Sequence, residues 1–309
     1  MSTASPLLPP AAGRPLPSPA AGHPGTGDDG RPPSPVTAWL RLLHSELRLI
    51  FLRWRNLALL AVLAAIPLLI GFAIRLAGSP GGGSGQGPAF LDQVAGNGVF
   101  LSFLALVVML TLALPLVVAV VAGDAVAGEA GHGTLRSLLT VPAGRTRLLL
   151  VKYTALVVFC LCACLLVAAV ALAVGAILFP VGPVTLLSGV TVSLPAGLLR
   201  LLFVVLYVAA AMASLAAVGL AVSTLTEHAI AAIAAILVVA VASEVTDSVS
   251  QFAVVHPYLP THWWLSFDAL LRTPVAWPEL TRGLLSFGLY AVIFGSVAWA
   301  RLTTADVTS

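Results

Sequence analysis

Charged residues are scarce in this sequence: they make up 9% of the 309 residues, whereas hydrophobic residues make up 59%. A soluble globular chain carries about 25% charged residues, so no soluble fold could hide this much apolar surface. Charge is absent altogether from six long stretches, which cover 57–74, 93–123, 153–199, 201–226, 228–243 and 283–300. The scarcity of charge therefore predicts an integral membrane protein.

Catalytic and nucleotide-binding patterns are also lacking. No GxxxxGK[ST] phosphate-binding loop occurs, so nothing in the chain holds ATP in the usual way. No Ser–His–Asp or paired-carboxylate arrangement can be placed on one face, and no basic run with interleaved aromatic residues indicates a nucleic-acid partner. We expect that the chain is not an enzyme, binds no nucleic acid and holds no cofactor of its own.

Cysteine and histidine do not indicate a metal site. The three cysteines lie two residues apart, at Cys160, Cys162 and Cys164. Each step of two turns about 200° around a helix, so these thiols cannot converge on one ion and are expected to be small buried apolar groups. Likewise, His132, His256 and His262 show no metal-ligand spacing. We expect no metal ligands in this chain.

The charge-free stretches predict six membrane-spanning helices and an all-α fold. A bilayer core requires about 20 apolar residues per helix, so most stretches span once. The stretch 153–199 is longer and is divided after Phe179, because Pro180, Gly182 and Pro183 break the helix. Its remainder, 184–199, contains Pro195 and is predicted to be a loop.

The region before the first span divides into a tail and an amphipathic helix. Residues 1–35 are rich in Pro, Gly and Ala and are predicted to be a disordered cytoplasmic tail, whereas 36–309 form one membrane domain. Ser34 and Pro35 favour a helix start. The helix places one apolar face at Leu40, Leu43, Leu47, Ile50, Phe51 and Trp54. It is predicted to lie at the cytoplasmic headgroups; the alternative is a plain extension of the first span.

Basic residues set the expected orientation. With the N-terminus inside, 11 Lys and Arg residues lie on the cytoplasmic side and 4 outside, which accounts for all 15. Because positive charge favours the cytoplasmic face, both termini are predicted to be cytoplasmic in a multi-pass protein of the plasma membrane. Contact with membrane lipids follows from this placement.

The longest external stretch, Glu244 to Arg282, is named the outer segment here. Aromatic residues alternate with prolines along it, which predicts short helices seated in the outer interface. Glu244 and Asp247 stand at the end of the fifth span, where ionisable groups are costly and therefore suggest function. The alternative is that both carboxylates simply reach the outer headgroups.

Between the second and third spans lies the coupling segment, Asp124 to Arg145. Thr134 can cap a short helix that Pro142 stops, and leucines at 135, 138 and 139 form one apolar face of that helix. Such a helix could dock into a soluble partner and transmit force, or it could merely cover the membrane helices.

The coupling segment resembles that of membrane permeases of type 2 ATP-binding cassette (ABC) exporters. The resemblance rests on Asp124, Glu129, the Gly133-Thr-Leu run, Pro142 and Arg145, and on Lys152 just beyond them. It extends to the amphipathic helix, the six-span order and the elaborated outer segment. Gly131 departs from the family pattern, as do residues 300–305, where aromatic and basic positions are replaced.

The resemblance implies partners and roles. It implies a homodimer or pseudodimer of permeases with a cytoplasmic ABC ATPase, which binds the ATP and Mg²⁺. The residues implied in ATPase coupling are Glu129, Gly133, Thr134, Leu135, Arg136, Leu138, Leu139 and Arg145. Spans two and five of the family line a central pathway, which here implies Phe103, Met109, Thr111, Ile233, Leu237 and, at its outer end, Glu244.

The leading functional hypothesis is therefore a permease subunit that exports an amphipathic or hydrophobic substrate, drug-like or lipid-like, with energy from the partner ATPase. The charge-poor pathway is the only basis for that substrate class. Alternatives are an ion-coupled secondary transporter that uses Glu244 as its coupling group, and a membrane assembly or anchor protein without transport activity. A lipid-modifying enzyme would require interfacial catalytic groups, and the sequence offers none.

Overall fold

The computed structural model describes residues 35–76, 97–131, 144–186 and 188–304, and these residues are nearly all helical. The α-helices are α1 (Pro35–Leu52), α2 (Trp54–Leu76), α4 (Phe100–Thr111), α5 (Ala113–Gly131), α7 (Arg145–Leu178), α8 (Leu194–Ser223), α9 (Ala229–Ser248) and α10 (Trp277–Thr304). Short 3-10 helices follow α9: η2 (Ser250–Phe252), η3 (His256–Tyr258) and η4 (Ser266–Leu271). The predicted tail, 1–34, lies outside the described residues.

Six candidate spans are present among the described residues if a bent pair is counted as one. Five helices, α2, α7, α8, α9 and α10, are each long and apolar enough to cross a membrane. The helices α4 and α5 pass the same test together as a pair bent by 54°, and they make a sixth span when the pair crosses as one. The all-α membrane fold is thus confirmed, and the six predicted spans agree with the five to six candidates.

Proline explains the bend between α4 and α5. Pro115 lies in the first turn of α5, has no N–H, and its ring would clash with the carbonyl of Thr111 in a continuous helix. The chain breaks at Leu112, and the next available donor, the N–H of Leu116, bonds to the Leu112 carbonyl at 3.0 Å. The second span therefore changes direction near its middle.

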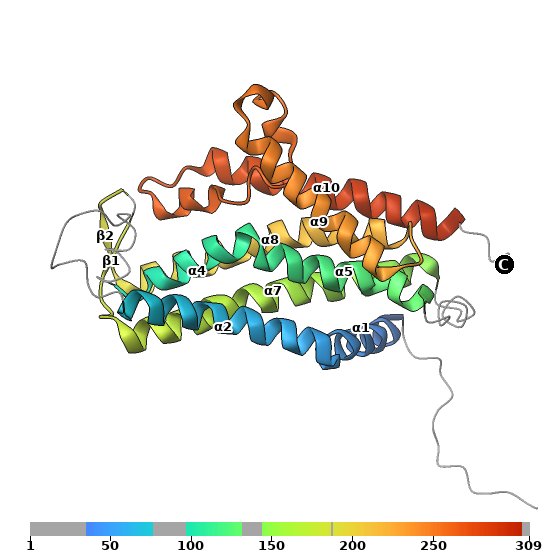
Figure 1. Ribbon diagram of the computed structural model, residues 1–309, viewed down its shortest axis with the longest axis horizontal. Helices are drawn as coiled ribbons and strands as arrows, with labels where there is room; N and C mark the ends of the chain where they lie inside the picture. Colours follow the sequence, from blue (N-terminus) through green and yellow to red (C-terminus); the bar gives the residue numbers. More distant parts are fainter. Residues whose placement is uncertain (1–34, 77–96, 132–143, 187, 305–309) are drawn as a thin grey trace, which may run out of the picture.

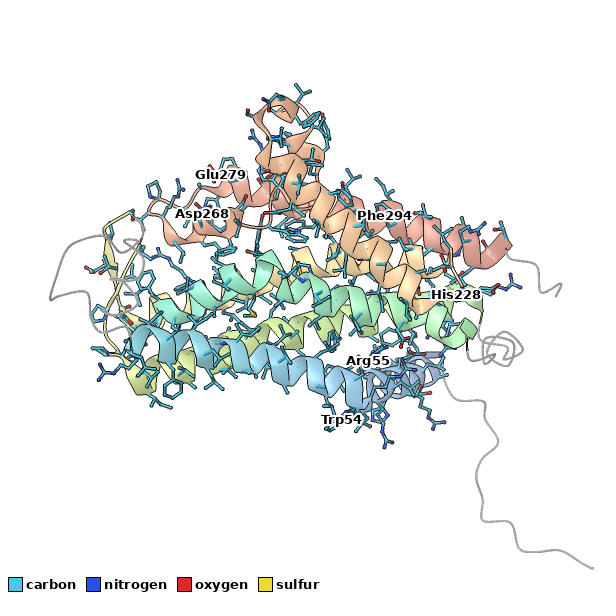
Figure 2. The ribbon with its side chains drawn as sticks, viewed as in Figure 1. Trp54, Arg55, His228, Asp268, Glu279 and Phe294 are labelled. Atoms are coloured by element: carbon cyan, nitrogen blue, oxygen red, sulfur yellow. The ribbon has the colours of Figure 1, made fainter. Side chains whose placement is uncertain are left out.

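The helix α8 occupies the centre of the bundle. It is the most buried of the five unbroken spans, and it packs against α5, α7 and α10. In Figure 1, α2 runs along one side of the bundle and α9 and α10 along the opposite side. The start of α1 and the end of α10 lie at the same end, called the coupling end here, and β1 and β2 lie at the other (Figure 1). Figure 2 places Arg55 and His228 toward the coupling end and Asp268 and Glu279 toward the other, so charge lies at both ends.

The predicted amphipathic helix is present as α1, but its apolar face is divided. Leu43 and Leu47 are half-buried in a helix that packs against α7, and the ring of Phe51 lies 5.6 Å from that of Phe159. Leu40, by contrast, is 52% exposed, and the prediction that Trp54 belongs to this helix is wrong, because Trp54 begins α2. One part of the face therefore binds protein, and the other is left for the surroundings.

The prediction of a loop over 184–199 is partly wrong. Residues Val184–Thr185 (β1) and Thr191–Val192 (β2) pair as a small antiparallel hairpin, and α8 then begins at Leu194. Pro195 lies in the first turn of α8, where a missing N–H costs nothing because that turn has no intrahelical acceptor. Here proline marks a helix start rather than a loop.

The outer segment forms the predicted short helices, which hydrogen bonds fasten to the bundle. The hydroxyl of Tyr207 on α8 donates to the carbonyl of Trp263 at 2.8 Å, and that of Tyr290 on α10 donates to the carbonyl of Tyr258 at 2.6 Å. The turns directly after α9 project away from the bundle (Figure 1). The outer segment is therefore an ordered cap with one projecting corner.

Candidate functional site

The coupling segment is only partly described. Six of its predicted docking residues, Gly133, Thr134, Leu135, Arg136, Leu138 and Leu139, lie outside the described residues. The backbone of Glu129 belongs to α5, but its side chain lies outside the described part. Arg145 begins α7 and is described in full. The structure thus gives the frame on either side of the predicted coupling helix.

Arg145 fastens the start of α7 to the end of α10. Its Nη1 donates to the carbonyl oxygens of Leu302 and Thr303, each at 3.0 Å. A cation at these carbonyls satisfies acceptors that a helix end leaves open and opposes the negative end of the helix dipole. Beside it, the indole N–H of Trp299 donates to Thr146 Oγ1 at 2.9 Å. The sequence does not reveal this role, because about half the chain separates the partners.

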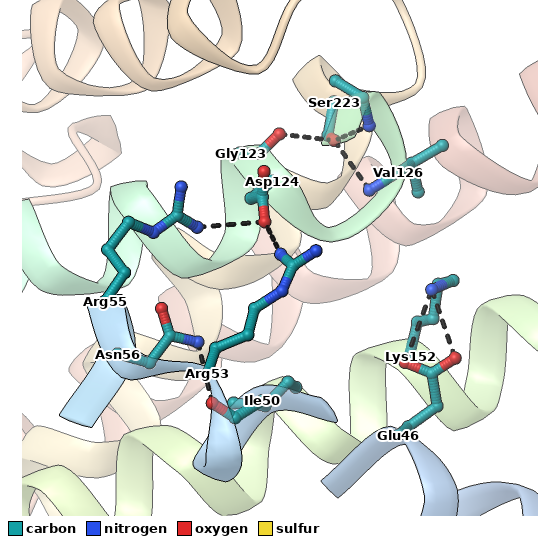
Figure 3. A network of polar contacts seen from close by, with 11 residues as sticks. Glu46, Ile50, Arg53, Arg55, Asn56, Gly123, Asp124, Val126, Lys152 and Ser223 are labelled. Atoms are coloured by element: carbon teal, nitrogen blue, oxygen red, sulfur yellow. Dashed lines mark hydrogen bonds and ion pairs between the residues drawn. The ribbon is translucent and has the colours of Figure 1, made fainter. Parts of the chain in front are cut away.

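Asp124 on α5 is paired with two arginines from the junction of α1 and α2 (Figure 3). Arg53 bonds to Asp124 Oδ2 through Nη1, and Nη2 of Arg55 lies 2.9 Å from the same oxygen. Asp124 is 8% exposed, whereas both arginine side chains are nearly half exposed. The two arginines therefore neutralise the carboxylate from its exposed side. The three charged groups together keep one net positive charge, which faces the surroundings.

The break between α1 and α2 positions these arginines. Arg53 is the single residue between the two helices, and the amide Nδ2 of Asn56 donates to the Ile50 carbonyl at 2.8 Å, which caps the end of α1. This turn sets Arg53 and Arg55 on the side of α5 (Figure 3). The distribution of basic residues predicts only that these arginines are cytoplasmic and does not indicate their shared partner.

Ser223 holds the backbone of α5 beside Asp124. Its hydroxyl donates to the Gly123 carbonyl at 2.8 Å and accepts from the N–H groups of Val126 and Ala127 at 3.1 and 2.9 Å (Figure 3). A side chain from the end of α8 thus replaces part of the hydrogen bonding of α5. The end of α5 is therefore fastened to both α8 and the α1–α2 junction.

A second ion pair joins α1 to α7. Nζ of Lys152 lies 3.2 and 3.4 Å from the two carboxylate oxygens of Glu46, and Lys152 is 4% exposed. This pair and the Asp124 cluster line one cavity of about 60 Å³ between α1, α2, α5 and α7. A buried cation with a carboxylate partner fixes how the helices fit together, since either charge alone would be costly there.

The predicted pathway residues do not form one continuous lining. Phe103 and Met109 are buried in the helix core, at 4% and 1% exposure. Ile233 packs against the backbone of α5: a Cβ added at Gly123 would lie 2.8 Å from Ile233 Cγ1. Leu237 is half-buried against the core. Phe103 and Met109 are therefore packing residues, and Leu237 is partly one. Ile233 holds α9 close to α5.

Thr111 and Glu244 are the two predicted pathway residues that the structure brings together. Both line a cavity of about 50 Å³ between the end of α4, the end of α9 and the outer segment. Thr111 stands at the bend of the second span, where its hydroxyl donates to the Val107 carbonyl at 3.2 Å.

The same cavity borders a cluster that the sequence analysis missed. Asp247, His256 and His262 place one ligand atom each within 4.8 Å of one another, a grouping that their spacing in the sequence did not predict. His262 is brought to Asp247 by the turns after η3, and such turns have no fixed spacing. Only the aromatic and proline pattern of the outer segment indicated that the chain folds back here.

Comparison with curated proteins finds no match to this chain. A protein-family model, by contrast, matches residues 52–243 and is described as an ABC-2 family transporter protein. The match covers well over half of the chain, from the end of α1 to α9, and includes the whole coupling segment. Permeases of this family work with an ATPase partner in ABC transporters, which agrees with the several apolar spans. The chain belongs to the ABC-2 transporter family, as a multi-pass membrane permease.

Proposed function

We propose that this chain is the permease subunit of an ATP-driven exporter that moves an amphipathic or hydrophobic, drug-like or lipid-like substrate out of the cytoplasm. Two permease copies, identical in the simplest case, act with a separate cytoplasmic ABC ATPase, which holds ATP and Mg²⁺. The coupling segment receives the ATPase. The chain itself hydrolyses nothing; its only lysine, Lys152, is paired with Glu46.

The observation that carries the proposal is the ion-paired frame around the coupling segment. The segment joins α5 to α7, and both helix ends are fastened to other helices: α5 by Asp124 to the α1–α2 junction, and α7 by Arg145 to α10. A displacement applied between α5 and α7 would therefore move α1, α2 and α10 with them. An ATPase that drives the permease from the cytoplasm requires such a connected frame. A membrane anchor without transport activity does not.

Charge supports the orientation. The coupling end carries Arg53, Arg55, Arg145 and Lys152, and the predicted distribution of basic residues is 11 inside against 4 outside. Positive charge favours the cytoplasmic face, so the coupling end faces the cytoplasm of a plasma membrane and meets a soluble ATPase there. The outer segment then faces outward in this orientation.

The test is co-purification. The intact chain, expressed with its natural co-expressed neighbours, is purified in mild detergent and assayed for an associated ATPase. We expect an ATPase to co-elute, and we expect the association to be lost when Leu135, Leu138 and Leu139 are changed to Asp. The matched control is Val181→Asp, an exposed apolar residue near β1, which leaves the association intact. Recovery of no ATPase with the intact chain would overturn the proposal.

Substrate class and direction require a second measurement. Inside-out membrane vesicles that contain both subunits are supplied with an amphipathic fluorescent dye and ATP. The proposal expects uptake into the vesicles that depends on ATP, because their cytoplasmic face is outward. ATP-dependent loss of dye from preloaded vesicles would instead establish import.

A further inference from the structure

The ligand-type cluster in the outer segment has a defined geometry. Oδ1 of Asp247, at the end of α9, lies 2.6 Å from Nδ1 of His262 and 3.8 Å from Nδ1 of His256. All three side chains are half-buried, with 17–28% of their surface exposed. The cluster lies beyond the residues that match the family, 52–243, so membership of the family does not account for it.

These distances between ligand atoms are close to the separations found between the nitrogen and oxygen ligands of a small metal ion. Zinc holds such atoms at about 2.0–2.1 Å, which separates tetrahedral ligands by about 3.3 Å from one another. The 3.8 Å pair is near this value, and the 2.6 Å pair is a hydrogen bond that an ion would open by less than about 1 Å. The ligand atoms of the two histidines lie within 4.8 Å of each other, so they must approach by up to about 1.5 Å for all three groups to bind one ion.

The second nitrogen of His256 supports the ligand role of the first. Nε2 of His256 lies 3.1 Å from the Val249 carbonyl, an acceptor, so this nitrogen carries the proton. In the neutral ring Nδ1 is then left with its lone pair on the side of Asp247. Metal-binding histidines usually donate their other N–H in this way, which fixes both the tautomer and the ring orientation. The ring of His262 is held edge-on to Trp263, with 4.8 Å between centroids.

The electrostatic surroundings favour a cation. The adjoining cavity of about 50 Å³ is lined by Glu244, Asp247 and His262, and none of its described lining residues is Lys or Arg. Two carboxylates and neutral imidazoles leave negative charge that a divalent ion would balance. The volume also admits water, which can complete the coordination. Thr261 contributes no ligand, because its hydroxyl bonds to Ser243 at 2.8 Å and thereby holds the turn against α9.

We propose that Asp247, His256 and His262 form a divalent transition-metal site that takes Zn²⁺, with the fourth position left to water. Two imidazole nitrogens and one carboxylate suit zinc, whereas Ca²⁺ and Mg²⁺ require all-oxygen ligand sets. The bound ion joins η3 and the following turn to the end of α9. It thereby fixes the outer segment over the cavity that contains Thr111 and Glu244.

The first experiment measures zinc binding by the full chain. Protein without a histidine tag, stripped with EDTA in detergent, is equilibrated with ZnCl₂ and desalted, and bound zinc is quantified. We expect one more equivalent per chain than in the variant Asp247→Asn/His256→Ala/His262→Ala, and single substitutions to weaken binding at least about tenfold. The matched control, His44→Ala/His228→Ala, removes two histidines elsewhere and retains the full equivalent.

The second experiment needs no variant and so does not depend on how well the substituted proteins fold. Co²⁺ bound to the intact chain is expected to give the strong visible absorption of a four-coordinate ion, and one equivalent of Zn²⁺ abolishes it. Zinc is also expected to raise the melting temperature, whereas excess Ca²⁺ or Mg²⁺ leaves it unchanged. Zinc retention equal in the intact chain and the triple variant, or a weak six-coordinate Co²⁺ spectrum, would overturn the proposal.

Discussion

Asp124 is stabilised by two partners, so the three charged groups of its cluster act as a unit. Arg53 and Arg55 share the one carboxylate, and each can neutralise it when the other is removed. The carboxylate itself is buried, so water replaces the arginines only in part. The cost of removing charges from the cluster is therefore non-additive.

We predict that Arg53→Gln and Arg55→Gln each lower the free energy of unfolding slightly, whereas the double substitution lowers it by about 1–3 kcal/mol. The double variant leaves a buried carboxylate without its two arginine partners. Adding Asp124→Asn to the double variant is expected to restore part of the stability, because it removes the uncompensated charge. Titration of the purified protein with SDS, followed by circular dichroism, measures the effect.

Arg48→Gln is the control for this series, since Arg48 is an exposed arginine of α1 near the same end. It is expected to change stability by less than about 0.5 kcal/mol. If the Asp124→Asn triple variant were less stable than the double variant, the cluster would be held by hydrogen bonding rather than by charge balance.

Arg145 supports a prediction about the end of α10. Arg145→Ala removes two charge-assisted bonds to the carbonyls of Leu302 and Thr303, so the last turn frays. Amide exchange in that turn is expected to rise about tenfold or more, a factor equivalent to one such bond. Hydrogen–deuterium exchange with mass spectrometry measures it. Arg301→Ala, an exposed arginine in the same turn, is the control and is expected to leave exchange there nearly unchanged.

At the scale of elements, α4 and α7 cross at a pair of glycines. Gly98, just before α4, and Gly175, near the end of α7, approach so closely that a Cβ on either would overlap the other's carbonyl oxygen. Because a carbonyl group belongs to the backbone, it cannot rotate away as the end of a side chain can. The N–H of Gly98 also donates to the Pro180 carbonyl at 2.9 Å, which ties the crossing to the turn after α7.

We predict that Gly175→Ala lowers the free energy of unfolding by about 1–3 kcal/mol through overpacking. Gly295→Ala on α10 is the matched control, because nothing lies within 4 Å of the added methyl group. It is expected to leave stability unchanged or to raise it by up to about 1 kcal/mol through helix propensity. SDS titration of both variants decides the matter; equal stability in the two would contradict the close crossing.

The helices could be predicted from the sequence where the cause of the helix is local. The groupings of residues in the sites could not. The six spans follow from charge-free stretches, since hydrocarbon excludes charge at every position of a span. The start of α8 was missed because Pro195 is equally compatible with a loop and with a first helical turn. The partners of Asp124, Arg145 and His262 depend on how distant helices pack, and no short spacing in the sequence encodes that.

At the scale of the whole molecule, the two ends differ in how they are built. At the coupling end, ion pairs such as Lys152–Glu46 join one helix to another, whereas the bonds that join the outer segment to α8 and α10 include the neutral bond from Tyr207 to the Trp263 carbonyl. Exposed apolar side chains lie on both α2 and the opposite side of the bundle, where α9 presents Val238 and Val241 and the projecting turn presents Val254. Lipid or a second permease copy must cover this side.

A second copy on this side predicts a specific cross-link. Val254→Cys, in a chain whose Cys160, Cys162 and Cys164 are replaced by Ala, places a thiol on the projecting turn, where the native side chain is 85% exposed. A short bis-maleimide added to membranes is expected to give covalent dimers on non-reducing gels. Val190→Cys, 45% exposed beside β2 in the hairpin at the far end from the coupling end, is the control and is expected to remain monomeric. Equal dimer yield at both positions would reflect random collision and contradict a dimer formed through α9.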